Sequence, residues 1–166
     1  MNKSDFASGF PVQAHDHAQC VQTMLRAADD HCAARGLRLT ALRRQVLELI
    51  WSDHKPVGAY ALLDMLGEDG RKAAPPTVYR ALEFLVEHGL AHRIASLNAF
   101  IGCVHPGEAH TPQFFLCRKC GDAAEVDDPR VHKAIAADAH NLDFDIADET
   151  VEISGICAQC RGGESA

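Results

Sequence analysis

Four cysteines of this chain form two pairs with the same spacing, and this spacing carries the clearest chemical signal in the sequence. Cys117 and Cys120 form the first Cys-x-x-Cys pair, and Cys157 and Cys160 form the second. Each such turn can point two thiolates at one ion at about 2.3 Å, and two turns complete a tetrahedral zinc site. The 36 residues between the pairs exceed the roughly 15 to 20 of compact zinc ribbons. We therefore expect a structural zinc site with a strand-helix-strand excursion between its two halves.

A second candidate metal site surrounds a cysteine outside these pairs. Cys103 lies between His92 and His110, and Glu125 follows the first Cys-x-x-Cys pair. One thiolate, two imidazoles and one carboxylate would make a four-coordinate zinc site of mixed ligands. Spacing alone leaves two alternatives open, because Cys103 can equally be a small core residue beside surface histidines. His105 is a competing ligand in the same segment.

Other histidines offer weaker metal hypotheses. His15 and His17 flank an aspartate near the start of the chain, and His132 and His140 are eight residues apart on an expected helix. A third metal site at these histidines is a further hypothesis, and a solvated surface is the alternative. A dithiol redox centre is a rival for the paired cysteines, but it normally requires a single Cys-x-x-Cys near a βαβ pattern.

The first part of the chain has the element order of a winged helix-turn-helix. Helices are expected over 17–35, 41–53, 59–67 and 77–89, followed by short strands at 90–94 and 99–104. The last helix carries Thr77, Tyr79 and Arg80 in its first turn, where a recognition helix contacts base edges. Other basic residues are candidates for phosphate contacts, the alternative being a solvated surface: Arg43, Arg44, Arg71 and Lys72.

The second part is shorter and has a mixed pattern. Strands are expected at 113–117 and 123–126 around the first cysteine pair, and a helix at 128–140. Alternating apolar residues predict two further strands, at 142–146 and 151–153. We expect residues 1–104 to form the first domain, with a flexible arm over 1–16, residues 105–112 a hinge, and residues 113–166 the second domain.

Charge separates the two parts in the same way. The chain of 166 residues has a net charge of −7, but residues 1–104 hold 11 basic and 11 acidic residues. The acidic excess lies entirely in residues 105–166, so the first part is not repelled from DNA by its net charge. The chain also lacks a secretory signal and a membrane-length apolar run, and we expect it to be cytoplasmic.

Several segments together resemble the ferric uptake regulator superfamily, most closely its zinc uptake regulators. The resemblance spans roughly residues 20–160 and rests on these stretches: RLTALRRQVLELI, PPTVYRALEFLVEHGLAHRI, NAFIGC, HTPQFFLCRKCG and GICAQC. It implies an α+β protein in which an N-terminal winged helix-turn-helix domain is joined by a hinge to a C-terminal α/β dimerisation domain with a four-cysteine zinc site.

The resemblance also implies a function. Cys117, Cys120, Cys157 and Cys160 match the structural zinc ligands, whereas His92, Cys103, His110 and Glu125 match the zinc-sensing set, giving two zinc ions per chain. Tyr79 and Arg80 match the base-contacting pair. These matches imply a dimeric repressor that binds palindromic operator DNA when loaded with zinc. The alternatives are an iron- or manganese-sensing regulator of the same family and a zinc- or thiol-dependent enzyme. Neither candidate metal site leaves an open position, so we expect no enzyme activity.

Overall fold

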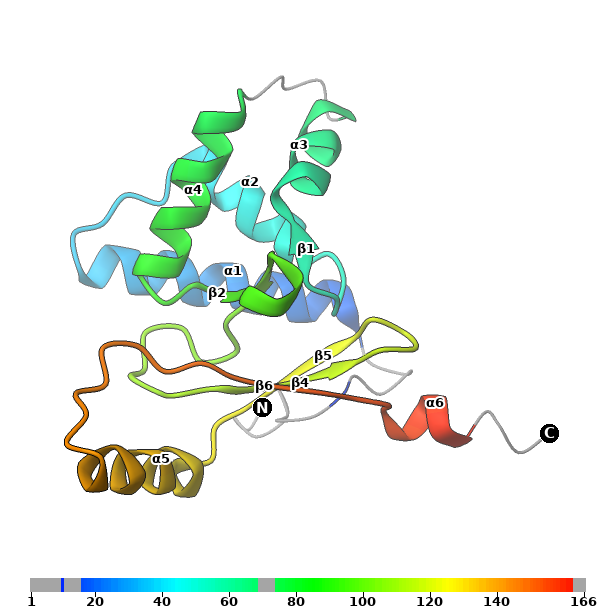
Figure 1. Cartoon of the computed structure of the whole chain (residues 1–166). Helices are drawn as coiled ribbons and strands as arrows, with labels where there is room; N and C mark the ends of the chain where they lie inside the picture. The colour runs from blue at the N-terminus through cyan, green and yellow to red at the C-terminus, as the bar shows by residue number, and fades with distance from the viewer. Residues whose placement is uncertain (1–9, 11–15, 69–73, 163–166) are drawn as a thin grey trace. The chain divides into compact units, whose positions relative to one another are not determined.

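The computed structural model describes Phe10 and residues 16–68 and 74–162 (Figure 1). The described chain divides after Glu108 into two compact units, with Phe10 grouped with the second. No helix in the described part of the chain is long and apolar enough to cross a membrane.

The first unit contains four helices that enclose one apolar core. These helices are α1 (His17–Ala34), α2 (Ala41–Ile50), α3 (Ala59–Glu68) and α4 (Pro75–Glu87). The Thr40 side chain accepts the main-chain N–H of Arg43 and so caps the start of α2. Apolar side chains at helical spacing turn inward from all four helices, and Val46, Leu62, Val78 and Leu85 are fully buried.

A small antiparallel sheet completes this unit. Strands β2 (Ala91–Ile94) and β3 (Ala99–Gly102) pair as a hairpin, and the two-residue strand β1 (Val57–Gly58) joins the other edge of β3. A single 3-10 turn, η1 (Ala95–Leu97), and Asn98 in the left-handed conformation connect the hairpin. Helices followed by this hairpin confirm the predicted winged helix-turn-helix. Sequence patterns did not predict β1, because two residues carry no periodicity.

Helix α4 begins two residues earlier than the pattern predicts. Pro75 and Pro76 occupy its first positions, where a missing N–H costs nothing, and the N–H groups of Thr77 and Val78 bond to the Ala74 carbonyl. The helix therefore needs no polar capping side chain. Gly89, with a φ of 66°, lets the chain reverse after α4 and enter β2.

The second unit is a three-stranded mixed sheet with two helices. Its strands, in the order β5-β4-β6, are β5 (Ala123–Val126), β4 (Gln113–Cys117) and β6 (Val151–Gly155). Strand β4 is antiparallel to β5 and parallel to β6, and helix α5 (Pro129–Asn141) lies in the crossover between β5 and β6. The short helix α6 (Ala158–Gly162) follows β6. This arrangement confirms the predicted excursion between the cysteine pairs.

The expected strand at 142–146 is wrong. Leu142 caps α5, Asp143 takes a φ of 52°, and the N–H of Phe144 bonds back to the Ala139 carbonyl. This Schellman-like helix ending reverses the chain direction, and residues 142–147 form no strand and pair with none. Leu142 and Phe144 are 77% and 65% exposed, so the alternation of apolar residues marks a surface and not a strand.

Candidate metal centres and DNA-binding surface

The two cysteine pairs converge in the second unit. Cys117 ends β4, Cys157 immediately precedes α6, and Gly155 of β6 lies opposite Cys117 in the parallel ladder. The four Sγ atoms lie within 4.8 Å of one another, and Cys120 and Cys157 are separated by 3.9 Å between their sulfurs. Sulfurs bound tetrahedrally at about 2.3 Å lie roughly 3.8 Å apart, so this cluster can hold a zinc ion.

Main-chain donors favour thiolate in this cluster. The N–H of Cys157 donates to the Cys117 sulfur at 3.4 Å. Hydrogen bonds from the main chain of Cys120 and Cys157 lower the pKa of Cys117 to about 6. Burial raises the pKa of Cys120 to about 12 in the absence of a cation. A divalent ion is therefore the partner that allows four adjacent thiols to ionise together.

The mixed set of ligands is divided between the two units. In the first unit, His92 lies on β2 and Cys103 follows β3, and their ligand atoms lie within 4.8 Å of each other. Cys103 is 1% exposed, and its N–H bonds to the Leu90 carbonyl, which fixes its place beside the end of α4. The hairpin and the residue that follows it thus present one imidazole and one thiol together.

In the second unit, His110 and Glu125 form a buried pair. Nε2 of His110 lies 2.8 Å from Oε1 of Glu125, and the two side chains are 6% and 1% exposed. Glu125 is held on β5 opposite Phe114. Imidazole and carboxylate groups are common metal ligands, and here the two are in direct contact and shielded from water.

The remaining histidines lie apart from these groups. His132 pairs with Glu149 at 2.7 Å, His17 bonds to the Ser52 carbonyl and packs against the His54 ring, and His105 lies in a turn closed by the Glu108 N–H. Within the described residues, none of these histidines, nor His140, joins a cluster of three or more metal-ligating side chains. His15 lies outside the described residues. The third metal site stays a prediction.

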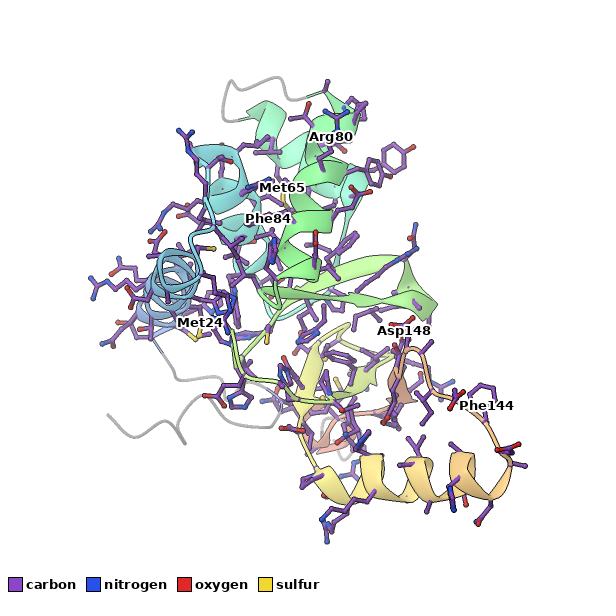
Figure 2. The ribbon with its side chains drawn as sticks, turned by 90° about the vertical axis from the view of Figure 1, so that its left-hand side faces the viewer. Met24, Met65, Arg80, Phe84, Phe144 and Asp148 are labelled. Carbon is purple, nitrogen blue, oxygen red and sulfur yellow. The ribbon has the colours of Figure 1, made fainter. Side chains whose placement is uncertain are left out.

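Five of the seven candidate DNA-binding residues are described by the structure, three on α4 and two on α2. Thr77, Tyr79 and Arg80 lie on the exposed side of α4, opposite the buried stripe of Val78 and Leu85, and Figure 2 labels Arg80 near the outer end of the helix. Their placement is what a recognition helix requires.

The two arginines of α2 are engaged within the unit itself. Arg43 lies over the Phe84 ring at 3.6 Å from its centroid and donates to the Arg38 carbonyl at 2.7 Å. Arg44 forms an ion pair with Asp29 of α1. Arg43 therefore supports α4 from α2 by a cation–π contact that spacing in the sequence did not reveal. The candidates Arg71 and Lys72 lie outside the described residues.

One polar residue that no sequence pattern marks connects three segments of the second unit by hydrogen bonds. Gln113 is 2% exposed at the start of β4, where its side-chain amide donates to the Thr111 carbonyl and its side-chain carbonyl accepts the N–H of Asp128. Asp128 in turn caps α5 through the N–H of Arg130. A single glutamine has no spacing signal, so only the structure identifies this role.

The sequence profile described as the Ferric uptake regulator family matches residues 34–154. The chain belongs to this family. The zinc uptake regulation protein of Escherichia coli (strain K12) is 37% identical over 140 residues, which cover 84% of this chain and 82% of that protein. The zinc uptake regulation protein of Mycobacterium tuberculosis (strain ATCC 25618 / H37Rv) is 30% identical over 132 residues, covering 78% and 98%.

Solved structures of this family agree with the fold. A zinc uptake regulator complexed with zinc and DNA superimposes with a TM-score of 0.82 at 36% identity, covering 88% of this chain and 98% of that one. The crystal structure of holo XcZur superimposes with a TM-score of 0.79 at 44% identity, covering 84% and 98%. Members of the ferric uptake regulator family are transcription regulators, and the winged helix of this chain fits that role.

Proposed function

We propose that this chain is a zinc-responsive transcriptional repressor that binds palindromic operator DNA as a dimer and controls zinc uptake genes. The observation that carries the proposal is the joint presence of a four-cysteine cluster and a winged helix in a chain similar to zinc uptake regulation proteins. The similar structure of a zinc uptake regulator complexed with zinc and DNA supports the proposal that this chain binds both zinc and DNA.

Two zinc ions per chain are proposed, with different tasks. Cys117, Cys120, Cys157 and Cys160 hold the first ion, which joins the ends of β4 and β6 and stabilises the second unit. This site is saturated by four protein ligands, and such closed sites are structural.

The second ion is the sensed one in this proposal. His92 and Cys103 supply two ligands from the first unit, and the His110–Glu125 pair supplies two from the second. Zinc then shifts the population toward the form that binds DNA, to the extent that it binds this form more tightly. The thiolate of Cys103 favours zinc over the harder iron(II) and manganese(II) ions.

Helix α4 provides the DNA contacts. Arg80 binds a base edge and Tyr79 contacts a thymine methyl group or a phosphate, from the exposed side of the helix. Arg80→Ala is expected to weaken operator binding by about 1–3 kcal/mol and to relax the preference at one position. Arg93→Ala, which removes a charge from strand β2 of the wing (the β2–β3 hairpin), is a control for net charge. Equal loss for operator and random DNA in Arg80→Ala would contradict base recognition.

Dimerisation uses the second unit. Its exposed surface holds several large apolar side chains, as a partner-binding face does: Phe115, Leu142, Phe144, Ile146, Ile153 and Ile156. A second copy of the chain covers this surface in the proposed dimer.

A paired measurement of zinc content and operator affinity tests the proposal. The parent chain should hold two zinc ions and bind its operator tightly, and removal of the exchangeable ion by a mild chelator should release the DNA. Cys103→Ser should keep one tightly bound ion and the dimer but gain no affinity when zinc is added. Cys32→Ser, which changes another buried thiol in the same unit, is the matched control and should respond like the parent.

The metal itself is tested in the same assay. Iron(II) and manganese(II) at buffered free concentrations should restore operator binding far less well than zinc. If either ion replaces zinc at a lower free concentration, the chain is an iron- or manganese-responsive member of its family.

A further inference from the structure

One histidine in the first unit lies where three segments meet. His31 is in the last turn of α1, and Arg35 follows it by four residues, so both side chains share one face of the helix end. Gly107, in the segment between β3 and the second unit, and His88, at the end of α4, complete the His31 junction. None of these four residues belongs to the proposed metal sites.

The hydrogen bonds of the junction determine which tautomer the His31 ring adopts. Nη1 of Arg35 lies 2.8 Å from Nδ1 of His31. Because a guanidinium can only donate, Nδ1 must accept, and the ring hydrogen is on Nε2. Burial and then the Arg35 charge lower the pKa of His31, which agrees with a neutral ring, and the main chain of His88 opposes this shift as a hydrogen-bonding group that raises the pKa. Because the His88 N–H already bonds to the Phe84 carbonyl, the His88 carbonyl is the group that faces the ring as acceptor.

Gly107 allows the main chain to lie in contact with the His31 ring. Its φ of 84° suits glycine, and a Cβ there would overlap Nδ1 of His31 and lie 2.8 Å from Cε1. The main chain at Gly107 is thus packed directly on the imidazole, and Nη2 of Arg35 donates to the Gly107 carbonyl at 3.4 Å. Open space surrounds Gly36, which has a similar φ of 65° at the end of α1.

The segment from Cys103 to Glu108 is therefore attached to the end of α4 at both of its ends. The Cys103 N–H bonds to the Leu90 carbonyl, just after α4. At the other end, the turn closed by the bond from the Glu108 N–H to the His105 carbonyl contacts His31, which bonds to His88. Along the sequence this segment begins at one proposed zinc ligand and ends two residues before another, His110.

We propose that His31 is a positioning residue that couples zinc binding at Cys103 and His110 to the placement of recognition helix α4. When the proposed ligands close on zinc, the segment between them takes one conformation, and its turn seats Gly107 on the His31 ring. The ring then holds the C-terminal end of α4 through the His88 carbonyl. This inference rests on the proposed zinc-responsive function and adds residues that contact neither ion nor DNA.

Operator affinity measured with and without saturating zinc tests the coupling. His31→Ala should reduce the zinc-induced gain in affinity by about 2- to 30-fold, the range found for residues that modulate coupling without touching a ligand. His31→Gln should recover most of the gain, because a glutamine amide can accept from Arg35 and donate to His88 together. By reciprocity, operator DNA should raise zinc affinity less in His31→Ala than in the parent.

A clash variant supplies a second, independent test. Gly107→Ala should lose the zinc-induced gain, and the double variant with His31→Ala should lose no more than Gly107→Ala alone, because the ring that the new methyl group meets is gone. Gly36→Ala carries comparable strain at positive φ in open space. It should unfold at a lower temperature but keep the full response to zinc.

Three outcomes overturn the inference. The first is that His31→Ala retains the parent's zinc-induced gain, and the second is that it weakens operator binding equally with and without zinc. The third is that the losses of His31→Ala and Gly107→Ala are additive in the double variant. A parent chain that gains no operator affinity with zinc fails the proposed function instead, before any variant is compared.

Discussion

The two units of this chain are stabilised in different ways. The first encloses side chains from four helices, and Leu62, Leu66 and Leu85 are completely buried. The second buries chiefly Phe114, Leu116, two alanines and cysteines, while α5 contributes no buried residue. An apolar core suffices for the first unit, whereas a small unit with little core needs a metal or a second copy. In the proposed function, the structural zinc ion therefore stabilises the second unit and not the first.

Loss of the cysteine cluster should have the largest effect and should separate the units. Cys117→Ser removes one thiolate of four, and structural zinc in small zinc-finger peptides supplies about 10–16 kcal/mol of apparent binding free energy. The second unit should lose its ion and its dimer contacts. Trp51, the single tryptophan, is buried in the first unit, so its fluorescence should report an almost unchanged unfolding transition there. Cys20→Ser is the control.

A substitution in the apolar core of the first unit should lower the stability of that unit alone. Leu85→Ala removes a fully buried side chain of α4 and should cost about 2–5 kcal/mol of that unit's stability. The denaturant midpoint followed by Trp51 fluorescence should fall, while zinc release followed by a metallochromic indicator keeps its midpoint. A shared fall of both midpoints would mean that the two units unfold as one.

A charge on the exposed apolar face should break the dimer without unfolding either unit. Leu142→Asp replaces a leucine that is 77% exposed in the single chain, and burial of a leucine contributes about 1.5–3 kcal/mol in each copy. Sedimentation velocity should show a dissociation constant raised at least about tenfold. Leu97→Asp, at a leucine 53% exposed on the wing, should remain dimeric.

The smallest effect concerns the cap of α5. Arg130, through its side chain first and its main-chain N–H second, lowers the pKa of Asp128 to about 2 from an ordinary value of 3.8. Because the folded form holds the proton less tightly, this contribution is complete above pH 4 and is lost as the pH falls through about 2. Acid titration of Asp128→Asn should lack this component of stability loss. An identical acid profile would mean that the cap adds nothing measurable.

The same contrast explains what the sequence could predict. Helix α2 was predictable because Thr40, a residue that caps helices, directly precedes its apolar stripe, and strands β4 and β5 were predictable because they flank the first cysteine pair. The strand expected at 142–146 failed because exposed apolar residues separated by polar ones have the same alternation as a half-buried strand. Helix α6 and β1 are too short to carry a period.

The candidate sites divide in a similar way. Local spacing predicted the cysteine cluster, because each half is a self-contained turn. The stacking of Arg43 on Phe84 and the contact of His31 with Gly107 join residues 41 and 76 positions apart. Such contacts depend on how helices pack, and a single sequence gives no periodic or compositional trace of them.

The parallel pairing of β4 with β6 has a consequence for synthesis of the chain. Cys117 and Cys120 leave the ribosome some 36 residues before Cys157. Only two of the four cysteines of the cluster are therefore present while α5 is made. All four helices and the wing of the first unit are complete by then, and domains generally fold as units in the order of translation. The winged-helix unit is therefore the first to acquire its structure, and the four-cysteine cluster can bind an ion only after β6 and Cys157 have been made.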